Sequence, residues 1–354
     1  MAVAKRGCLT VMVGVALAAV LALGAGVWLW QGQARFADHP VTPEADSVVI
    51  ASGDSFSTVL SKLRAAGVDD GRDVQWQWLA RQLDAAGKLK VGEYALQPAP
   101  TPRELLVRMR QGKVLQYRFT IIEGWNIRQL RAAIARARPL KQESGAMSDA
   151  ELMAALGAPG QHPEGRFLPE TYVYQRTDSD LDVLKRAHSA MEQAVAQVWE
   201  QRADHLPINS PVELLTLASI VEKETGLASE RPQIAGVFSR RLTLGMRLQT
   251  DPTVIYGIGS AYDGNIRKVH LTTDTPYNTY TRAGLPPTPI AMPGRDALRA
   301  AAHPAAGQSL YFVALGDGSG GHEFSATYAE HTAAVARYLQ RLRQNKNKNE
   351  AVTP

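Results

Sequence analysis

The carboxylates best placed for chemistry stand at the end of an apolar stretch, residues 214–226, which reads LLTLASIVEKETG. Apolar residues recur there at the i, i+3, i+4 and i+7 positions counted from Leu214, a spacing that predicts one apolar stripe along a helix. Glu222 projects from the edge of this stripe, whereas Glu224, two residues later, cannot share a face with it. The pattern therefore singles out Glu222.

Two effects are expected to raise the pKa of the Glu222 carboxyl. Apolar neighbours disfavour its charged form, and the partial negative charge at the C-terminal end of a helix acts in the same direction. A carboxyl that keeps its proton near neutral pH can serve as a general acid. The alternative is a helix-edge glutamate that pairs with a lysine or arginine and takes no part in catalysis.

Several other kinds of chemistry are excluded by the residues present. His322 and Glu323 begin like the zinc-protease motif HExxH, but the position of its second histidine holds Ala326. The eight histidines lack ligand spacing and the chain has one cysteine, so we expect neither a metal site nor a cofactor. No G-x-S-x-G motif is present, and the glycine-rich residues 316–321 fit a hairpin turn better than a phosphate loop. Carboxylate chemistry with polar and aromatic helpers remains, which is the usual equipment for acting on sugars.

The helix that carries Glu222 has well-marked ends. Ser210 can cap it, Pro211 suits its first position, and Glu213 completes a capping box. Gly226 is a natural residue to end it.

The N-terminal region predicts a membrane anchor. Residues 7–30 form an apolar run long enough to cross a bilayer, and the preceding Lys5 and Arg6 place residues 1–6 in the cytoplasm. A cleaved signal peptide is the alternative, although its apolar region would normally be shorter. The net charge of +5 comes without a long basic run, so we expect no nucleic-acid partner.

The remaining chain divides by composition into a linker, two folded regions and a tail. Residues 31–47 are polar and contain proline, as linkers do. Residues 48–114 predict a strand–helix–helix–strand order that resembles a LysM module, a small carbohydrate-binding unit; a purely structural subdomain is the alternative. Residues 115–345 mix helices and strands, and residues 346–354 are expected to be disordered. The predicted fold class is α+β with an N-terminal transmembrane helix.

Three later stretches are rich in polar residues and turn signals. Residues 248–257 read LQTDPTVIYG, in which Asp251 before Pro252 predicts a turn, and residues 277–280 read YNTY. Residues 284–294 contain four prolines and cannot form regular structure, and rigid loops of this kind often shape a cleft.

Taken together, five motifs resemble the membrane-bound endolytic murein transglycosylases. They are ASIVEKET, LQTDPTVIYG, YNTY, GLPP and YFVA, in the family's order and spacing, and the resemblance runs from about Val48 to Tyr338. It implies a single anchor in the inner (cytoplasmic) membrane, a LysM-like subdomain and one catalytic domain in the periplasm. It implies no cofactor.

The resemblance also implies a reaction. Family members cut peptidoglycan glycan strands internally, between N-acetylmuramic acid (MurNAc) and N-acetylglucosamine (GlcNAc), and so terminate nascent strands. The 6-hydroxyl of MurNAc attacks its own anomeric carbon and leaves a 1,6-anhydro end, which removes the need for the second carboxyl of ordinary glycosidases. The family glutamate falls on Glu222, as acid and then as base. Peptidoglycan synthases are candidate partners.

The residues that the resemblance places in the substrate cleft come from the polar motifs. They are Gln249, Asp251, Tyr277, Asn278 and Thr279, with Glu170 and Tyr172 as further candidates. Loop-stabilising hydrogen bonds are the alternative role for the last two. Two other functions stay open: a non-catalytic membrane-anchored scaffold that binds peptidoglycan, and a hydrolase with Asp251 or Glu224 as second carboxylate.

Overall fold

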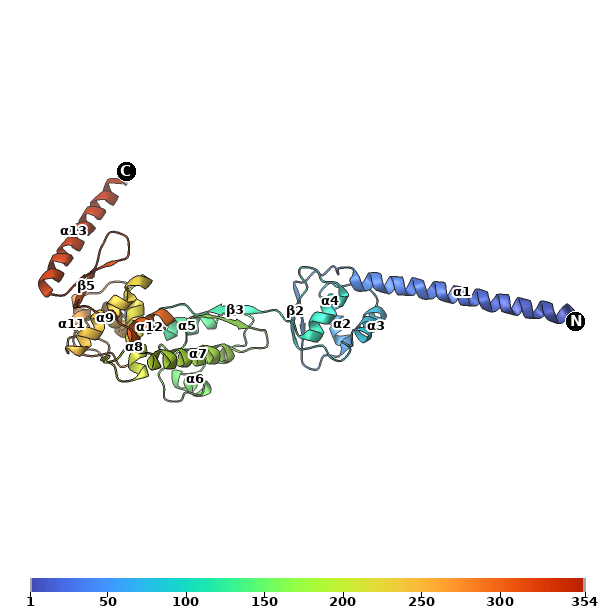
Figure 1. The fold of residues 1–354 in the computed structure, drawn as a ribbon, viewed down its shortest axis with the longest axis horizontal. Helices are drawn as coiled ribbons and strands as arrows, with labels where there is room; N and C mark the ends of the chain where they lie inside the picture. Colours follow the sequence, from blue (N-terminus) through green and yellow to red (C-terminus); the bar gives the residue numbers. More distant parts are fainter. Residues whose placement is uncertain (1, 353–354) are drawn as a thin grey trace. The chain divides into compact units, whose positions relative to one another are not determined.

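The computed structural model describes residues 2–352, and the side chains of residues 12–345, as two compact units (Figure 1). The first unit contains the chain up to Tyr117 together with Gln175–Thr177. The second contains Arg118–Tyr174 and the chain from Asp178 onward. Helices and short antiparallel strands occur in both, which confirms a mixed α+β fold.

The first unit begins with one long helix, α1 (Ala2–Asp38). Within its segment Met12–Asp38, an 18-residue window has a mean hydropathy of 2.3, so the helix is long and apolar enough to cross a membrane, which fits a single-pass anchor. The linker expected from residue 31 is wrong over its first part, because the helix continues to Asp38. Ala37 is buried and the Phe36 ring packs edge-on against Trp76, so contacts with the folded unit extend the helix beyond the apolar run.

The expected strand–helix–helix–strand order is confirmed in the rest of this unit. The elements are β1 (Ser47–Ile50), α2 (Phe56–Ala65), α3 (Asp73–Gln82) and β2 (Gly92–Ala95), followed by α4 (Pro102–Gln111). The two strands pair antiparallel, with Val48 opposite Tyr94. Side chains from both strands and all three short helices meet in one apolar core around Trp76, Tyr94 and Leu105.

The second unit starts with a two-stranded sheet and three helices. These are β3 (Tyr117–Thr120), which pairs with β4 (Thr171–Tyr174), then α5 (Ile127–Ile134), α6 (Asp149–Ala155) and α7 (Asp180–Glu200). Capping boxes at Asn126, Ser148 and Ser179 begin the three helices, so local sequence determines where each one starts.

Helix α8 (Pro211–Glu224) lies at the centre of the second unit, packed against α7, α9 (Arg231–Thr243) and α12 (Arg295–Ala302). Every residue from Leu214 to Val221 is buried, so the single apolar stripe expected for this helix is wrong. A helix enclosed by neighbours on all sides has no solvent-facing side to leave polar.

The C-terminal part contributes shorter elements and a final helix. They are η1 (Ala228–Glu230), α10 (Asp251–Ile258), η2 (Gly259–Ala261), α11 (Lys268–Thr272), the β5 (Tyr311–Ala314) and β6 (His322–Ser325) hairpin, and α13 (Tyr328–Val352). The turn expected at Asp251 is wrong, because Pro252 stands in the first turn of α10, where proline is well tolerated. The tail expected to be disordered from residue 346 is helical to Val352, since α13 contains no glycine or proline to end it. Residues 353 and 354 of that tail lie outside the described residues.

Replacing Gly165 with alanine is expected to destabilise the protein more than replacing Gly160. Both glycines have a positive φ, 77° and 79°, so an alanine at either position is strained by roughly 1–2 kcal/mol. Only at Gly165 would the new Cβ come within 2.5 Å of the Pro289 side chain, and such overpacking adds about 1–3 kcal/mol. Denaturant unfolding of the full-length protein in detergent measures both losses, and equal losses would contradict the close packing of Gly165.

Candidate active site

The end of α8 sends its two carboxylates into different surroundings. The helix ends at Glu224 because Thr225, the next residue, is extended, with φ −142° and ψ 138°. Glu222 faces the loop that precedes α12, whereas Glu224 faces the segment that leads into α10. The two side chains therefore differ in both their partners and their access to ligand.

Glu222 is held by hydrogen bonds on both of its oxygens. Its side chain is 5% exposed; Oε2 accepts a hydrogen bond of 2.9 Å from the Gly294 N–H, and Oε1 accepts one of 3.3 Å from Arg231. Burial raises the pKa of this carboxyl, as expected from the sequence, although the Gly294 N–H and the Arg231 charge oppose the shift. The contact with Arg231 fits the alternative interpretation of Glu222 as a helix-edge glutamate paired with an arginine.

Arg231 extends this arrangement into a cluster of ion pairs. Besides Glu222, its guanidinium lies 3.5 Å from Glu123 and 3.7 Å from Asp296. Glu123 in turn lies directly against Gly294, where any larger residue would collide with it. The cluster ties the end of α8 to the start of α9, the start of α12 and the loop after β3.

Glu224 lies in the wall of a pocket of about 340 Å³. Burial raises the pKa of its carboxyl to about 7, and the negative charge of Asp251 adds to the shift. A hydrogen bond donated by the Thr250 hydroxyl lowers the pKa and fixes the carboxyl in place. Glu224 can therefore carry a proton near neutral pH where a ligand can reach it.

The pocket combines carboxylates, an arginine and aromatic rings from distant parts of the second unit. Its lining residues are Glu224, Arg241, Leu248, Gln249, Asp251, Tyr280, Tyr311, Phe312, Tyr328 and His331. The structure thus brings Gln249 and Asp251, two of the predicted cleft residues, into contact with one space. Glu222 is not among the residues that line it.

Thr279 supports the pocket wall from behind. Gln249 has a φ of 50°, a left-handed conformation that costs about 1–3 kcal/mol for a residue other than glycine. The Gln249 N–H donates to the Thr279 carbonyl at 3.2 Å, and the Thr250 N–H donates to the Thr279 hydroxyl at 3.0 Å. Thr279 is itself buried, so it positions this segment rather than facing the pocket.

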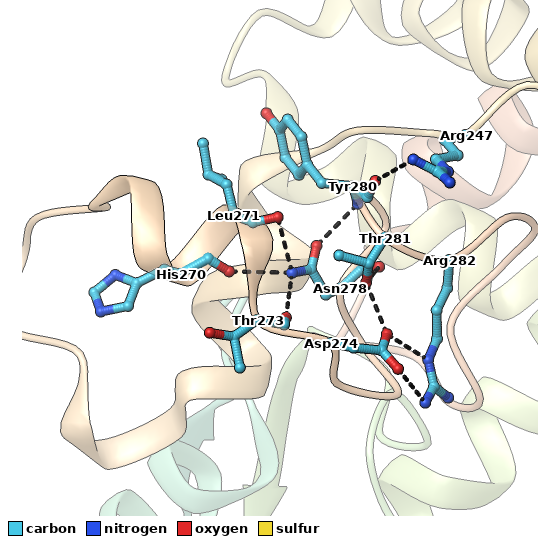
Figure 2. Close-up of polar contacts among 9 residues, drawn as sticks. All are labelled: Arg247, His270, Leu271, Thr273, Asp274, Asn278, Tyr280, Thr281 and Arg282. Carbon is cyan, nitrogen blue, oxygen red and sulfur yellow. Dashed lines mark hydrogen bonds and ion pairs between the residues drawn. The ribbon is translucent and has the colours of Figure 1, made fainter.

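Asn278 organises the loop that carries Tyr280 (Figure 2). Its amide nitrogen donates to the carbonyls of His270, Leu271 and Thr273, and its oxygen accepts from the Tyr280 N–H at 2.9 Å. Asn278 is buried, and these bonds occupy both ends of the amide. Its contribution to the site is therefore the shape of the loop.

The other predicted cleft residues make contacts within the fold. The Tyr277 hydroxyl lies 2.8 Å from that of Thr288, and Tyr277 does not line the pocket. Glu170 accepts an ion-paired hydrogen bond of 2.9 Å from Arg295. The buried Tyr172 hydroxyl donates to the Leu168 carbonyl at 2.7 Å, and burial raises its pKa. These contacts of Glu170 and Tyr172 fit the alternative role expected for them, that of loop-stabilising hydrogen bonds.

Sequence reasoning did not select several residues that line the pocket. Tyr280 belongs to the YNTY motif, and its hydroxyl donates to Asp251 at 2.7 Å. Arg241 donates to the Leu248 carbonyl at 2.7 Å, and burial lowers its pKa. Tyr311 stacks on His331 with ring centres 5.1 Å apart. This contact joins β5 to α13, and no local sequence pattern predicts it.

The arrangement offers a proton donor, hydrogen-bonding groups and aromatic faces around one space, which suits a sugar ligand. Among the residues with described side chains, no group of three or more His, Cys, Asp or Glu residues could hold a metal ion.

Three comparisons with known proteins agree with one another. The model of the YceG-like family matches residues 48–337. An endolytic murein transglycosylase of Bacillus subtilis is 30% identical over 321 residues, covering 85% of this chain and 88% of that protein. One from Streptococcus pneumoniae is 27% identical over 294 residues, covering 71% of this chain and 51% of that longer protein.

A solved structure shares the fold as well. The crystal structure of a yceG-like protein from Listeria monocytogenes aligns with a TM-score of 0.53 and 30% identity, covering 82% of this chain and 99% of that one. With the family match spanning most of its length, this chain belongs to the YceG-like family.

Proposed function

We propose that this protein is a membrane-anchored endolytic murein transglycosylase, the activity for which its curated relatives are named. It cuts the bond between MurNAc and GlcNAc inside glycan strands and leaves 1,6-anhydro-MurNAc ends. The observation that carries the proposal is Glu224, a carboxyl with a pKa of about 7 in the wall of a polar and aromatic pocket.

Glu224, rather than the Glu222 expected from the sequence, is the proposed general acid. A catalytic acid must reach the reacting oxygen of the substrate, and Glu224 lines the pocket. Each oxygen of Glu222 accepts one hydrogen bond, from Gly294 or Arg231, and Glu222 does not line the pocket. Glu222 then acts as a structural residue that fixes the end of α8.

The proposed reaction needs one carboxyl for both proton transfers. Glu224 gives its proton to the glycosidic oxygen while the bond from that oxygen to C1 of MurNAc breaks. The 6-hydroxyl of the same sugar bonds to C1, and its proton passes to the Glu224 carboxylate, which regains its starting state. Asp251 supplies negative charge beside the positive charge that develops on the ring, and proximity of the internal hydroxyl lowers the barrier.

The proposed setting is the inner membrane, crossed once by α1 with the N-terminus in the cytoplasm and both folded units in the periplasm. Support comes from the apolar helix and from the basic residues before it. Cutting there would terminate nascent strands close to the peptidoglycan synthases. The LysM-like part of the first unit is proposed to bind glycan.

Two matched variants separate the roles of the two glutamates. Glu224→Gln is expected to lower the cleavage rate by about 10²–10⁴-fold, because glutamine cannot donate the proton. Glu222→Gln can still accept from Gly294, so cleavage is expected to persist, while removal of one partner of a buried ion pair lowers stability by about 3–5 kcal/mol at most. Cleavage of uncrosslinked glycan strands and denaturant unfolding measure the two effects.

The opposite result, an inactive Glu222→Gln and an active Glu224→Gln, would overturn the assignment to Glu224. Mass spectrometry of the wild-type products tests the mechanism itself. Anhydro-MurNAc ends are expected from the internal hydroxyl. Reducing ends would mean that water attacks with Asp251 as second carboxylate, a possibility favoured only by its place in the same pocket. Absence of cleavage by the wild-type protein in membranes would support the scaffold function.

The pH dependence of cleavage gives an independent test of Glu224. The acid is active while protonated, so kcat/KM is expected to fall as the pH rises through about 7. Thr250→Val removes a hydrogen bond that lowers the pKa, so the fall is expected at higher pH. Asp251→Asn removes a charge that raises the pKa, so the fall is expected at lower pH. Shifts in the same direction for both variants would argue against Glu224 as the titrating group.

A further inference from the structure

The junction between α1 and the first unit contains a groove of about 640 Å³ that the proposed function does not use. Its walls come from the last turns of the apolar helix and from α3. The lining residues are Gly26, Trp28, Leu29, Trp30, Gly32, Gln33, Arg72, Val74, Gln75 and Trp78. Six of these ten residues belong to the helix that fits a membrane span.

The helix is fixed to the unit only a short distance after the apolar run ends. The Gln33 amide donates to the Gln75 carbonyl at 3.0 Å, and the Phe36 ring packs on Trp76 with centres 5.2 Å apart. Phe36 follows Trp30 by six residues, which is about 9 Å along a helix. A headgroup layer is about 5–8 Å thick on each side of the hydrocarbon, so α3 must lie at the membrane surface if α1 crosses the bilayer.

Helix α3 presents apolar side chains on its exposed face beside α1. Val74 is 67% exposed and Trp78 is 46% exposed, and their spacing of four residues places them on one face. Trp76 and Leu79, on the other face, are buried in the core. A soluble unit gains nothing from this exposed pair, whereas tryptophan is enriched where a protein meets the headgroup layer.

Arg72 adds a positive charge at the same groove. It precedes the first residue of α3 and is exposed, and no acidic side chain among those described for residues 12–345 pairs with it. An apolar wall with a free guanidinium at its end matches an acyl chain joined to a phosphate.

We propose that the groove between α1 and α3 binds a phospholipid of the membrane that α1 crosses. The acyl chain lies against Val74 and Trp78, and the phosphate meets Arg72. The occupant follows from continuity, because the groove shares Trp28 and Trp30 with the apolar helix itself. The bound lipid would hold the first unit in a fixed orientation on the bilayer. This inference rests on α1 as an anchor and is independent of the catalytic assignment.

Spin labels at two valines test the proposal on the full-length protein in phospholipid nanodiscs. In a Cys8→Ser background, Val74→Cys places a label at the groove, and Val91→Cys places one on an equally simple exposed valine elsewhere in the unit. Helix α4 separates these regions, since Arg103 near its start pairs with Asp38 and Gly112 at its end contacts Lys90. The two ends of that helix lie about 15 Å apart.

The label at position 74 is expected to be several-fold more accessible to oxygen than to a water-soluble nickel complex, relative to the label at position 91. Equal ratios at both positions would mean that the groove faces water and would overturn the proposal. Both native residues are exposed, so neither substitution threatens the core.

Quenching by brominated phospholipids gives a second readout without labels. Trp78→Phe removes emission that lipid can quench, so the quenched fraction of total fluorescence is expected to fall. Trp199→Phe removes the emission of a ring that does not line the groove, so the quenched fraction is expected to rise. A rise in both variants would contradict lipid contact at Trp78.

Discussion

The burial of helix α8 is the constraint on which the second unit depends. Since its residues from Leu214 to Val221 are all enclosed, the polar side chains among them must bond within the protein. The Ser219 hydroxyl donates to the Thr216 carbonyl at 2.7 Å and accepts from the Ile290 N–H at 3.0 Å. The same enclosure removes water from the two carboxyls that follow, Glu222 and Glu224, and so disfavours their charged forms. The two carboxyls differ in the partners that offset this effect.

At Glu222 the Arg231 guanidinium and the Gly294 N–H offset the free-energy cost of burying a charged carboxylate. Through Arg231, Glu222 joins the ion-pair cluster that links α8, α9, α12 and the loop after β3. Glu224 accepts a hydrogen bond from the neutral hydroxyl of Thr250, and the Arg241 and His322 charges also lower its pKa, but burial and the Asp251 charge outweigh them and raise the pKa to about 7. One physical cause, desolvation at the end of a buried helix, thus raises the pKa of two carboxyls two positions apart, for which the proposed roles are structural for Glu222 and catalytic for Glu224.

Features determined by short stretches of sequence could be predicted, and those that arise from packing could not. The start of α8 at Pro211 agrees with prediction, because capping residues act over three or four positions. The proposed choice of Glu224 over Glu222 depends on which of the two carboxyls lines the pocket. The apolar pattern of α8 does not predict which carboxyl this is, because the helix is buried on all sides. The pocket is lined in part by Tyr311, which lies about ninety residues later in the sequence.

For a related reason, the sequence does not show which residues of the polar motifs line the pocket and which hold its loops in place. A motif identifies residues that a family needs, but it does not separate those that face the ligand from those that hold the loop. Asp251 lines the pocket, whereas the Asn278 amide donates hydrogen bonds to three backbone carbonyls. Both residues lie in equally polar stretches of the sequence. The backbone of Gln249 is strained, and the buried Thr279 holds it through hydrogen bonds.

Asp251 pairs with Tyr280 in the wall of the pocket that Glu224 lines. Two carboxyls in one pocket repel when both are charged, and the charge of Asp251 accordingly favours the protonated form of Glu224. The Tyr280 hydroxyl donates to Asp251 at 2.7 Å and holds that side chain in the wall of the same pocket. Burial thus favours the protonated form of Glu224, and Tyr280 positions Asp251 beside it. This arrangement suits the proposed reaction, in which an oxygen is protonated while positive charge develops on the neighbouring sugar ring.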